Sequence, residues 1–517
     1  MAAFVTDQFR ILNATNFVES VSDTNNSYYI FLGLPNPTEA APNGGNAFGR
    51  NADWNNSETV AGMPPDPYDN FEYLSFYKEV GMFGKRVTKD NVRRVIRKVE
   101  WKANTKYDMY RHDYSRDNTA PVSNASRLYN ANYYVINKDF RVYICIDNGS
   151  SGSNPTVTSS KFEPTFTDSQ PGPDAGDGYI WKYLFTVAPS DIIKFDSTEY
   201  IVVPNDWSTS TGEIERIRNA GDSNTNLNGQ IKKVYIENGG TGYSNLTGRN
   251  IVGDGTGGTV DITTNSDGKI TDVTIATGGY GYTFGFVDLP GTSGTKAKLI
   301  PIIPPSRGHG YDIYKELGAD RVLMYARFDD STRDFPSDTH FSQVGILKNP
   351  TQPSSDTLFA GQTYSSLYAI KFDPDNFNVT PIIGQKIRQQ NSDGTITARG
   401  YVASYDSLTG VLKYVVDRSN YFGADQTDVD NSPNLIGFDS SNTTVYFGDD
   451  SVTNLTGTID TVSVSKVGTI DLGITLSNGL ASPEINKSTG EILYIDNRKV
   501  VVRNLRQKED VKIILEF

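Results

Sequence analysis

The residue types that most often carry out chemistry in proteins are scarce in this sequence. It has three histidines, His112, His309 and His340, and a single cysteine, Cys145. The histidines do not stand in the HExxH or HxH spacing of a zinc site, and a three-histidine site would need all of them. Cys145 lies in the run RVYICID, which is typical of a buried strand, where a thiol behaves as a small apolar side chain. We therefore expect no metal, no cofactor and no catalytic site.

Two short motifs resemble ligand-binding loops but have the wrong surroundings. Residues 253–258, GDGTGG, match GxGxxG, yet a dinucleotide fingerprint must open a helix. The residues that follow, TVDITT, form a strand pattern instead. Residues 373–378, DPDNFN, break the spacing of a calcium loop, because Asn378 stands where that loop needs glycine. We predict a turn at both places.

A basic cluster followed by aromatic residues is the first candidate for an interaction surface. Such a cluster is either a solvated face or a contact with an acidic partner, and arginine and tyrosine are enriched in protein interfaces. The candidate partner interface consists of Arg93, Arg94, Arg97, Lys98, Tyr107 and Tyr110.

The stretch GDGYIWKYLF, residues 176–185, places a ring on every second residue. The four rings belong to Tyr179, Trp181, Tyr183 and Phe185. On a strand they share one face, and two of the three residues between them are apolar. Because both faces are then covered, we predict a core strand rather than an open platform for stacking a ligand.

Length and charge limit the possible partners. The chain has 517 residues and a formal net charge of −13, which allows two to four domains. Without clustered basic residues, binding to nucleic acid or to an anionic membrane is not expected. The N-terminus has no signal-peptide pattern, and no apolar run approaches the ~20 residues that a bilayer needs. We expect synthesis in a reducing cytoplasm.

The secondary structure pattern is mainly β with a few short helices. Helical spacing of Phe9, Leu12, Phe17 and Val18 predicts an amphipathic helix over 6–22. The remaining predictions are a strand over 27–35, a loop over 36–68, a helix ending at Gly84, a helix or strand over 92–101, a hairpin over 131–147 bending at 137–139, a hairpin around 496–498 and a last strand over 511–517.

Residues 213–305 are rich in glycine and threonine and contain a repeat. IKKVYIENGGTGYS, from Ile231, and ITDVTIATGGYGYT, from Ile270, share the pattern strand, Gly-Gly-X-Gly-Tyr. Two copies are too few for a solenoid. We predict two similar β-units packed together, with Tyr243 and Tyr282 in equivalent places.

An ordered set of motifs resembles one known family. GDGYIWKYLF with EYIVVP, then SQVGILKNP, then TGEILYIDNR and the terminal KIILEF, is similar to wedge subunit eight of the baseplate of T-even-like contractile-tailed bacteriophages. VTDQFRILNATNF, VIRKVEW with TKYDMY, and IYKELGADRVLMYARFDD also resemble it. The length of the chain is similar to the long form carried by phages of marine cyanobacteria.

The resemblance implies a structural virion protein of the tail baseplate, assembled in the host cytoplasm and without enzymatic activity. It implies a multi-domain β-sandwich core, a homodimer within each wedge, and partners resembling wedge subunits six, seven and ten. Two alternatives remain: a carbohydrate- or receptor-binding tail module, for which the Gly-Tyr repeats are the candidate site, and a glycan-degrading tail enzyme, since carboxylates are plentiful.

The motifs of the family divide the chain into five expected segments. The family core occupies 1–212, 306–350 and 481–517, and it is interrupted by inserted β-rich domains at 213–305 and 351–480.

Overall fold

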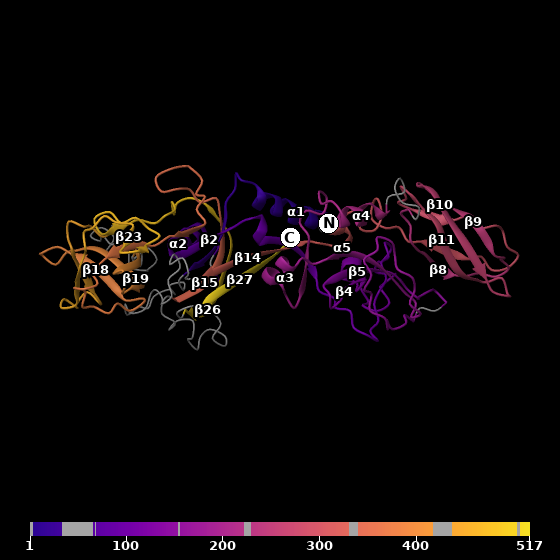
Figure 1. Cartoon of the computed structure of the whole chain (residues 1–517), viewed down its shortest axis with the longest axis horizontal. Coiled ribbons are helices and arrows are strands. Elements are labelled where there is room, and N and C mark those ends of the chain that lie inside the picture. The colour runs from indigo at the N-terminus through magenta and orange to yellow at the C-terminus, as the bar shows by residue number, and fades with distance from the viewer. Residues whose placement is uncertain are drawn as a thin grey trace. The chain divides into compact units, whose positions relative to one another are not determined.

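The computed structural model describes residues 4–33, 66–67, 69–153, 156–221, 229–329, 340–416, 437–503 and 507–517. Within them the protein is mainly β, with several sheets and few helices, which confirms the predicted class (Figure 1). The α-helices are α1 (Asp7–Ser22), α2 (Phe71–Val80), α3 (Pro189–Phe195), α4 (Glu213–Arg218) and α5 (Ile313–Leu317). The expected loop over 36–68 lies almost entirely outside the described residues.

The chain divides into two compact units, each built from segments distant in sequence. Unit 1 contains Met1–Val18, Arg93–Leu323 and Ile514–Phe517, and unit 2 contains Glu19–Val92 and Met324–Ile513. A four-stranded sheet has the order β27-β14-β3-β7. Its strands are β3 (Val92–Arg97), β7 (Tyr200–Val203), β14 (Arg321–Asp329) and β27 (Lys508–Glu516). The ambiguous segment 92–101 is therefore a strand over Val92–Arg97 and not a helix.

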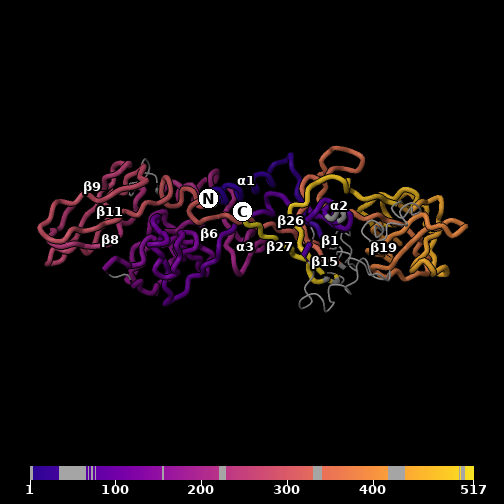
Figure 2. Tube along the Cα trace, turned by 180° about the vertical axis from the view of Figure 1, so that it is seen from behind, coloured from indigo at the N-terminus to yellow at the C-terminus, as the bar shows by residue number. Residues whose placement is uncertain are grey.

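Unit 2 contains a five-stranded antiparallel sheet of order β16-β2-β1-β15-β26 (Figure 2). Its strands are β1 (Tyr28–Gly33), β2 (Gly81–Val87), β15 (His340–Lys348), β16 (Thr363–Ser365) and β26 (Glu491–Val502). All six residues of β1 are buried, because β2 and β15 flank it. Tyr29 also fixes the neighbouring loop, donating its hydroxyl to the carbonyl of Gly361 at 2.8 Å.

Two predicted boundaries in this sheet are wrong. α2 ends at Val80, not at Gly84, because residues from Gly81 onward pair with β1. Gly84 fits there since a Cβ would overlap the ring of Tyr364. The expected hairpin around 496–498 is the middle of the single strand β26. Asn497 is accommodated in it because its side chain accepts a hydrogen bond from Gln343 at 2.8 Å.

A seven-stranded sheet of order β22-β21-β18-β19-β20-β17-β25 also lies in unit 2. Its strands are β17 (Tyr368–Lys371), β18 (Lys386–Gln390), β19 (Ile396–Asp406), β20 (Val411–Val416), β21 (Thr444–Phe447), β22 (Thr456–Thr458) and β25 (Leu480–Ala481); β23 (Lys466–Val467) and β24 (Ile470–Asp471) form a separate pair. One hydrophobic cluster covers it, drawn entirely from residues 370–459. The predicted turn at 373–378 is present, with Asp373 accepting from Asn376.

Unit 1 contains a three-stranded sheet of β4 (Tyr134–Ile136), β5 (Arg141–Asn148) and β6 (Tyr179–Thr186). The first two strands form the predicted hairpin. Asn137 closes its turn by accepting hydrogen bonds from the backbone of Asp139 and Arg141.

The repeat region forms an intertwined pair rather than two separate units. Its strands are β8 (Val234–Asn238), β9 (Leu246–Gly253), β10 (Thr256–Thr264), β11 (Ile270–Tyr280), β12 (Gly285–Val287) and β13 (Lys298–Pro301). Figure 1 labels the first four of them, which lie together. The strand of the first copy, β8, pairs with β13, which follows the second copy; β11, of the second copy, pairs with β10, which follows the first. The strand of each repeat copy is thus hydrogen-bonded to a strand that follows the other copy in sequence.

The hydrogen bonds around the two glycine pairs are reciprocal. The amide of Ile231 donates to Gly278, and the amide of Ile270 donates to Gly239. Tyr243 accepts from the amide of Ala297, and Tyr282 accepts from the amide of Gly258. The two donors are as far apart in sequence as the two tyrosines, 39 residues. Both tyrosines belong to one hydrophobic cluster drawn entirely from residues 231–303, so they occupy equivalent places, as predicted. GDGTGG is the turn between β9 and β10.

Candidate functional site

The basic cluster on β3 is engaged within the chain itself. Arg93 forms a two-point ion pair with Asp191, at 3.1 and 2.9 Å. Arg94 is buried, with its guanidinium 4.1 Å from the centre of the Tyr314 ring. Arg97 is exposed and donates to the carbonyl of Ala131 at 3.0 Å. Lys98 donates to the carbonyl of Ser197.

The aromatic half of that predicted interface is also internal. Tyr107 and Tyr110 are 2% and 4% exposed. The expectation of one surface formed by all six residues therefore needs correction, because Arg94, Tyr107 and Tyr110 are core side chains of this chain. A role in an interface for Arg93, Arg97 and Lys98 stays a prediction.

The four rings of β6 are buried in the sheet β4-β5-β6. Tyr179 and Trp181 stack with ring centres 5.5 Å apart, and the ring of Tyr107 meets Trp181 edge-on at 5.8 Å. Tyr183 packs against Tyr143, and Phe185 against Trp207. These contacts leave no open stacking face at the four rings.

The structure also contains buried ionisable side chains that no sequence pattern predicts. His309 and Glu316 form a buried pair at 2.5 Å, and the amide of Gly310 donates to the same carboxylate. Lys182, on β6, is fully buried and donates to the carbonyl of Ser169. Burial lowers the pKa of Lys182 to about 8. Burial, and then repulsion by Lys182, lowers the pKa of Lys232 to about 7.

The lone thiol has the environment expected of an inert cysteine. Cys145 is buried and donates to the carbonyl of Asp147. Burial raises the pKa of the thiol well above its usual range, which disfavours the reactive thiolate. Among the described residues no three His, Cys, Asp or Glu side chains are grouped so that they could hold a metal ion.

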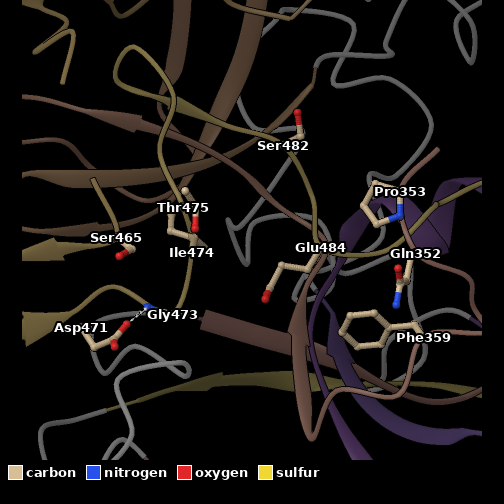
Figure 3. A pocket seen from close by; sticks show the side chains of 10 residues that line it. All are labelled: Gln352, Pro353, Phe359, Ser465, Asp471, Gly473, Ile474, Thr475, Ser482 and Glu484. Carbon is tan, nitrogen blue, oxygen red and sulfur yellow. Dashed lines mark hydrogen bonds between the residues drawn. The ribbon is translucent and has the colours of Figure 1, made fainter. Parts of the chain in front are cut away.

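A pocket of about 560 Å³ lies within unit 2. Figure 3 shows its lining, in which Phe359, Gln352 and Glu484 face several small polar residues of 465–475. Its two carboxylates support the backbone: Glu484 accepts from the amide of Ser365 at 2.6 Å and Asp471 from that of Gly473 at 3.1 Å. The lining fits a small polar molecule, and nothing in it distinguishes one carboxylate as an acid from the other as a base.

Comparison with known proteins gives two concordant matches. Residues 155–234 match the family model described as Bacteriophage T4, Gp8. The chain is also 28% identical, over 223 residues, to the baseplate wedge protein gp8 of Enterobacteria phage T4. That alignment covers 39% of this chain and 60% of the relative. Over the aligned residues the chain is therefore similar to the baseplate wedge gp8 family, and it spans less than two thirds of the length of that relative.

The gp8 match covers β6, α3, β7 and α4 and ends where β8 begins. It thus passes the boundary expected between 212 and 213. α4 packs with the matched part of the chain, since Arg216 donates to the carbonyl of Thr167 and Arg218 to that of Ser210.

The gp8-like chain also presents an apolar surface that sequence reasoning missed. The expected apolar face of α1 is wrong in part: Val18 is buried, but Phe9 and Leu12 are 53% and 52% exposed. The buried stripe is Ile11, Ala14, Val18 and Val21. No described helix is long and apolar enough to cross a membrane.

Proposed function

We propose that this protein is a structural subunit of a phage tail baseplate wedge and that it acts by associating with other subunits, without catalysis. The observation that carries the proposal is the 223-residue similarity to the T4 baseplate wedge protein. On this proposal it forms a homodimer, binds partners that resemble wedge subunits six, seven and ten, and is incorporated into the virion after assembly in the host cytoplasm.

The exposed apolar face at the start of the chain supports an associating role. Val5, Phe9 and Leu12 are spaced so that they share one side of the helix α1 and its approach. Phe4, 79% exposed, extends the patch. Contiguous exposed apolar side chains mark protein contacts more often than isolated ones. We place a contact between two copies of the chain here.

The test is to replace Phe9 and Leu12 by glutamate in the full-length protein and to measure mass in solution by light scattering. We expect the wild type to be a dimer and the double variant a monomer with an unchanged melting temperature. Phe286→Glu adds a charge at an exposed apolar residue outside α1, 55% exposed, and is the matched control. A monomeric wild type that also fails to bind neighbouring wedge proteins would contradict the proposed function.

A further inference from the structure

A second cavity, of about 510 Å³, lies beside the Gly-Tyr motif of the second repeat copy. Its wall is formed by residues 280–283, by Gln230, and by residues from 110–112 and 303–307 of the same unit. No lining residue is acidic, although the chain as a whole carries a net charge of −13. The volume is within the usual range of small-molecule sites.

One wall of the cavity is an exposed aromatic ring on a rigid turn. Tyr280 is 50% exposed. It stands between Gly279 and Gly281, whose φ angles are 57° and 76°. A Cβ at Gly279 would lie 2.5 Å from the backbone of Gly258 and Thr256, so the turn is packed tightly against β10. The backbone that carries Tyr280 is therefore fixed, while half of the surface of this residue faces solvent.

The floor of the cavity is rigid as well. The amide of Tyr282 donates to the side chain of Gln230 at 2.9 Å, and that side chain donates back to the carbonyl of Tyr282 at 3.2 Å. The hydroxyl of Tyr282 donates to Ile251 and accepts from Gly258. A floor whose polar groups are all paired favours a preorganised site.

The remaining polar groups of the wall offer hydrogen-bond donors. Tyr110 is buried and lines the cavity. His112 accepts the amide of Ile303 at Nδ1, at 3.2 Å. Desolvation lowers the pKa of His112, so the neutral ring carries its proton on Nε2.

A positive charge stands at the edge of the cavity. Arg307 has a left-handed backbone, with φ 66°, a strained conformation that clusters at functional sites. Its guanidinium lies 4.2 Å from the centre of the Tyr311 ring, and it donates to the Tyr311 hydroxyl at 2.7 Å. Ser306 adds an exposed hydroxyl beside it.

The equivalent place in the first repeat copy is closed. Thr241 stands where the second copy has Tyr280. It is covered by residues 292–295, since Thr292 donates to its carbonyl and the amide of Thr295 donates to its hydroxyl. The cavity is therefore not a general product of the repeat.

We propose that this cavity binds an anionic sugar, with the apolar face of the ring on Tyr280 and a carboxylate or phosphate group held by Arg307, His112 and Tyr110. An aromatic face suits the C–H side of a sugar ring. Donors without any lining carboxylate favour an acceptor-rich, negatively charged group. The proposal does not depend on the role in the wedge.

The experiment is calorimetric titration of the full-length protein at low salt with three probes: trigalacturonate, glucose 6-phosphate and neutral maltotriose. We expect at least one anionic probe to bind about tenfold more tightly than maltotriose, a difference of about 1.4 kcal/mol. Raising the salt concentration should weaken that binding, since the charge contribution is screened.

Three variants test the assignment of residues. Tyr280→Ala should weaken binding of the anionic probe about tenfold, and Tyr280→Phe should retain it. Arg307→Gln should remove the preference for the anionic probe. Phe286→Ala is the matched control, because Phe286 is an exposed ring of the same region, 55% exposed, outside the cavity.

Four results would overturn the proposal. They are no binding of any probe by a protein with normal melting, equal affinity for neutral and anionic probes, an unchanged Tyr280→Ala variant, and equal losses in the Tyr280 and Phe286 variants. None of them bears on dimer formation or wedge binding, which are measured separately.

Discussion

Trp181 has the largest ring on β6, and its indole nitrogen makes no hydrogen bond. It is 5% exposed and packs against Tyr179 and Tyr107. Its indole nitrogen is buried without a hydrogen-bond partner. Packing, and not hydrogen bonding, therefore makes up its contribution to stability.

Trp181→Ala is expected to lower the free energy of unfolding by about 3–5 kcal/mol, as for other buried large aromatics. Trp181→Phe should lose less, because it keeps a ring and removes an unpaired polar atom. Urea unfolding followed by circular dichroism measures both. A Trp181→Ala protein that melts normally but fails to assemble would instead make Trp181 an interface residue.

Lys182 should make stability depend on pH in the alkaline range. Its pKa falls to about 8 in the folded protein because of burial, against about 10.4 when exposed. Below pH 8 Lys182 is charged in both the folded and the unfolded protein, and the folded protein bears the full cost of desolvating that charge. Between pH 8 and 10 only the unfolded state holds the proton, so stability rises with pH.

Lys182→Met should flatten that rise, with urea unfolding at pH 7, 8, 9 and 10 as the measurement. It should also raise the pKa of Lys232, because the repulsion from Lys182 disappears. An unchanged slope in the variant would assign the pH dependence to other groups.

At the scale of elements, sequence patterns predicted those strands and turns that are determined by interactions between residues close in sequence. The hairpin over 131–147 and the strand of rings at 179–186 were predictable, because alternation and a turn residue, Asn137, specify them. The inward face of α1 was not predictable. That helix has two apolar stripes, and only tertiary packing decides that the stripe of Ile11 is buried and that of Phe9 is not.

The pairing of strands distant in sequence could not be predicted either, because it too depends on tertiary packing. Asp496 and Asn497 are typical turn residues, yet they lie within β26, where they pair with Val344 and Gln343 of β15. The reciprocal pairing of the repeat copies was also missed, because two identical motifs do not specify which strand each one selects.

Gly279→Ala tests how closely the turn of the second repeat copy packs against β10. A Cβ there would meet backbone at 2.5 Å, and φ is 57°. Gly248 has φ 61° and open space around its Cβ position, so Gly248→Ala is the matched control. The control should cost about 1 kcal/mol for its backbone alone, and Gly279→Ala clearly more, measured by thermal melting. Equal losses would mean that β10 moves aside easily.

At the scale of the molecule, the segment with the repeat has a core of its own. Its hydrophobic cluster lies within 231–303. Its contacts with the rest of unit 1 include the ion pair of Lys233 with Asp147 and the Arg111 guanidinium 4.1 Å from the Tyr235 ring centre. Since α4 packs with the family part, we now place the start of the insertion after α4 instead of at 213.

Replacing residues 229–304 by a short Gly-Ser linker should therefore leave a folded protein that still dimerises. The two ends of the segment, Gln230 and Pro304, line the same cavity, so a short linker spans them. Melting and light scattering are the measurements. Aggregation of this deletion variant would show that the segment belongs to the core. A smaller deletion that removes only one repeat copy should aggregate in any case, because the remaining copy would lack the strand with which it pairs.

The sheet of unit 2 also has a consequence for how the protein is made. β1 ends at residue 33 and its neighbour β15 begins at residue 340, so 306 residues separate them. At roughly 5–20 residues per second, a ribosome needs about 15–60 s to deliver that neighbour. Throughout this interval the apolar strand YYIFLG lacks one of its two partners. We therefore expect the nascent chain to be a client for chaperones until β15, at the start of its last third, has been translated.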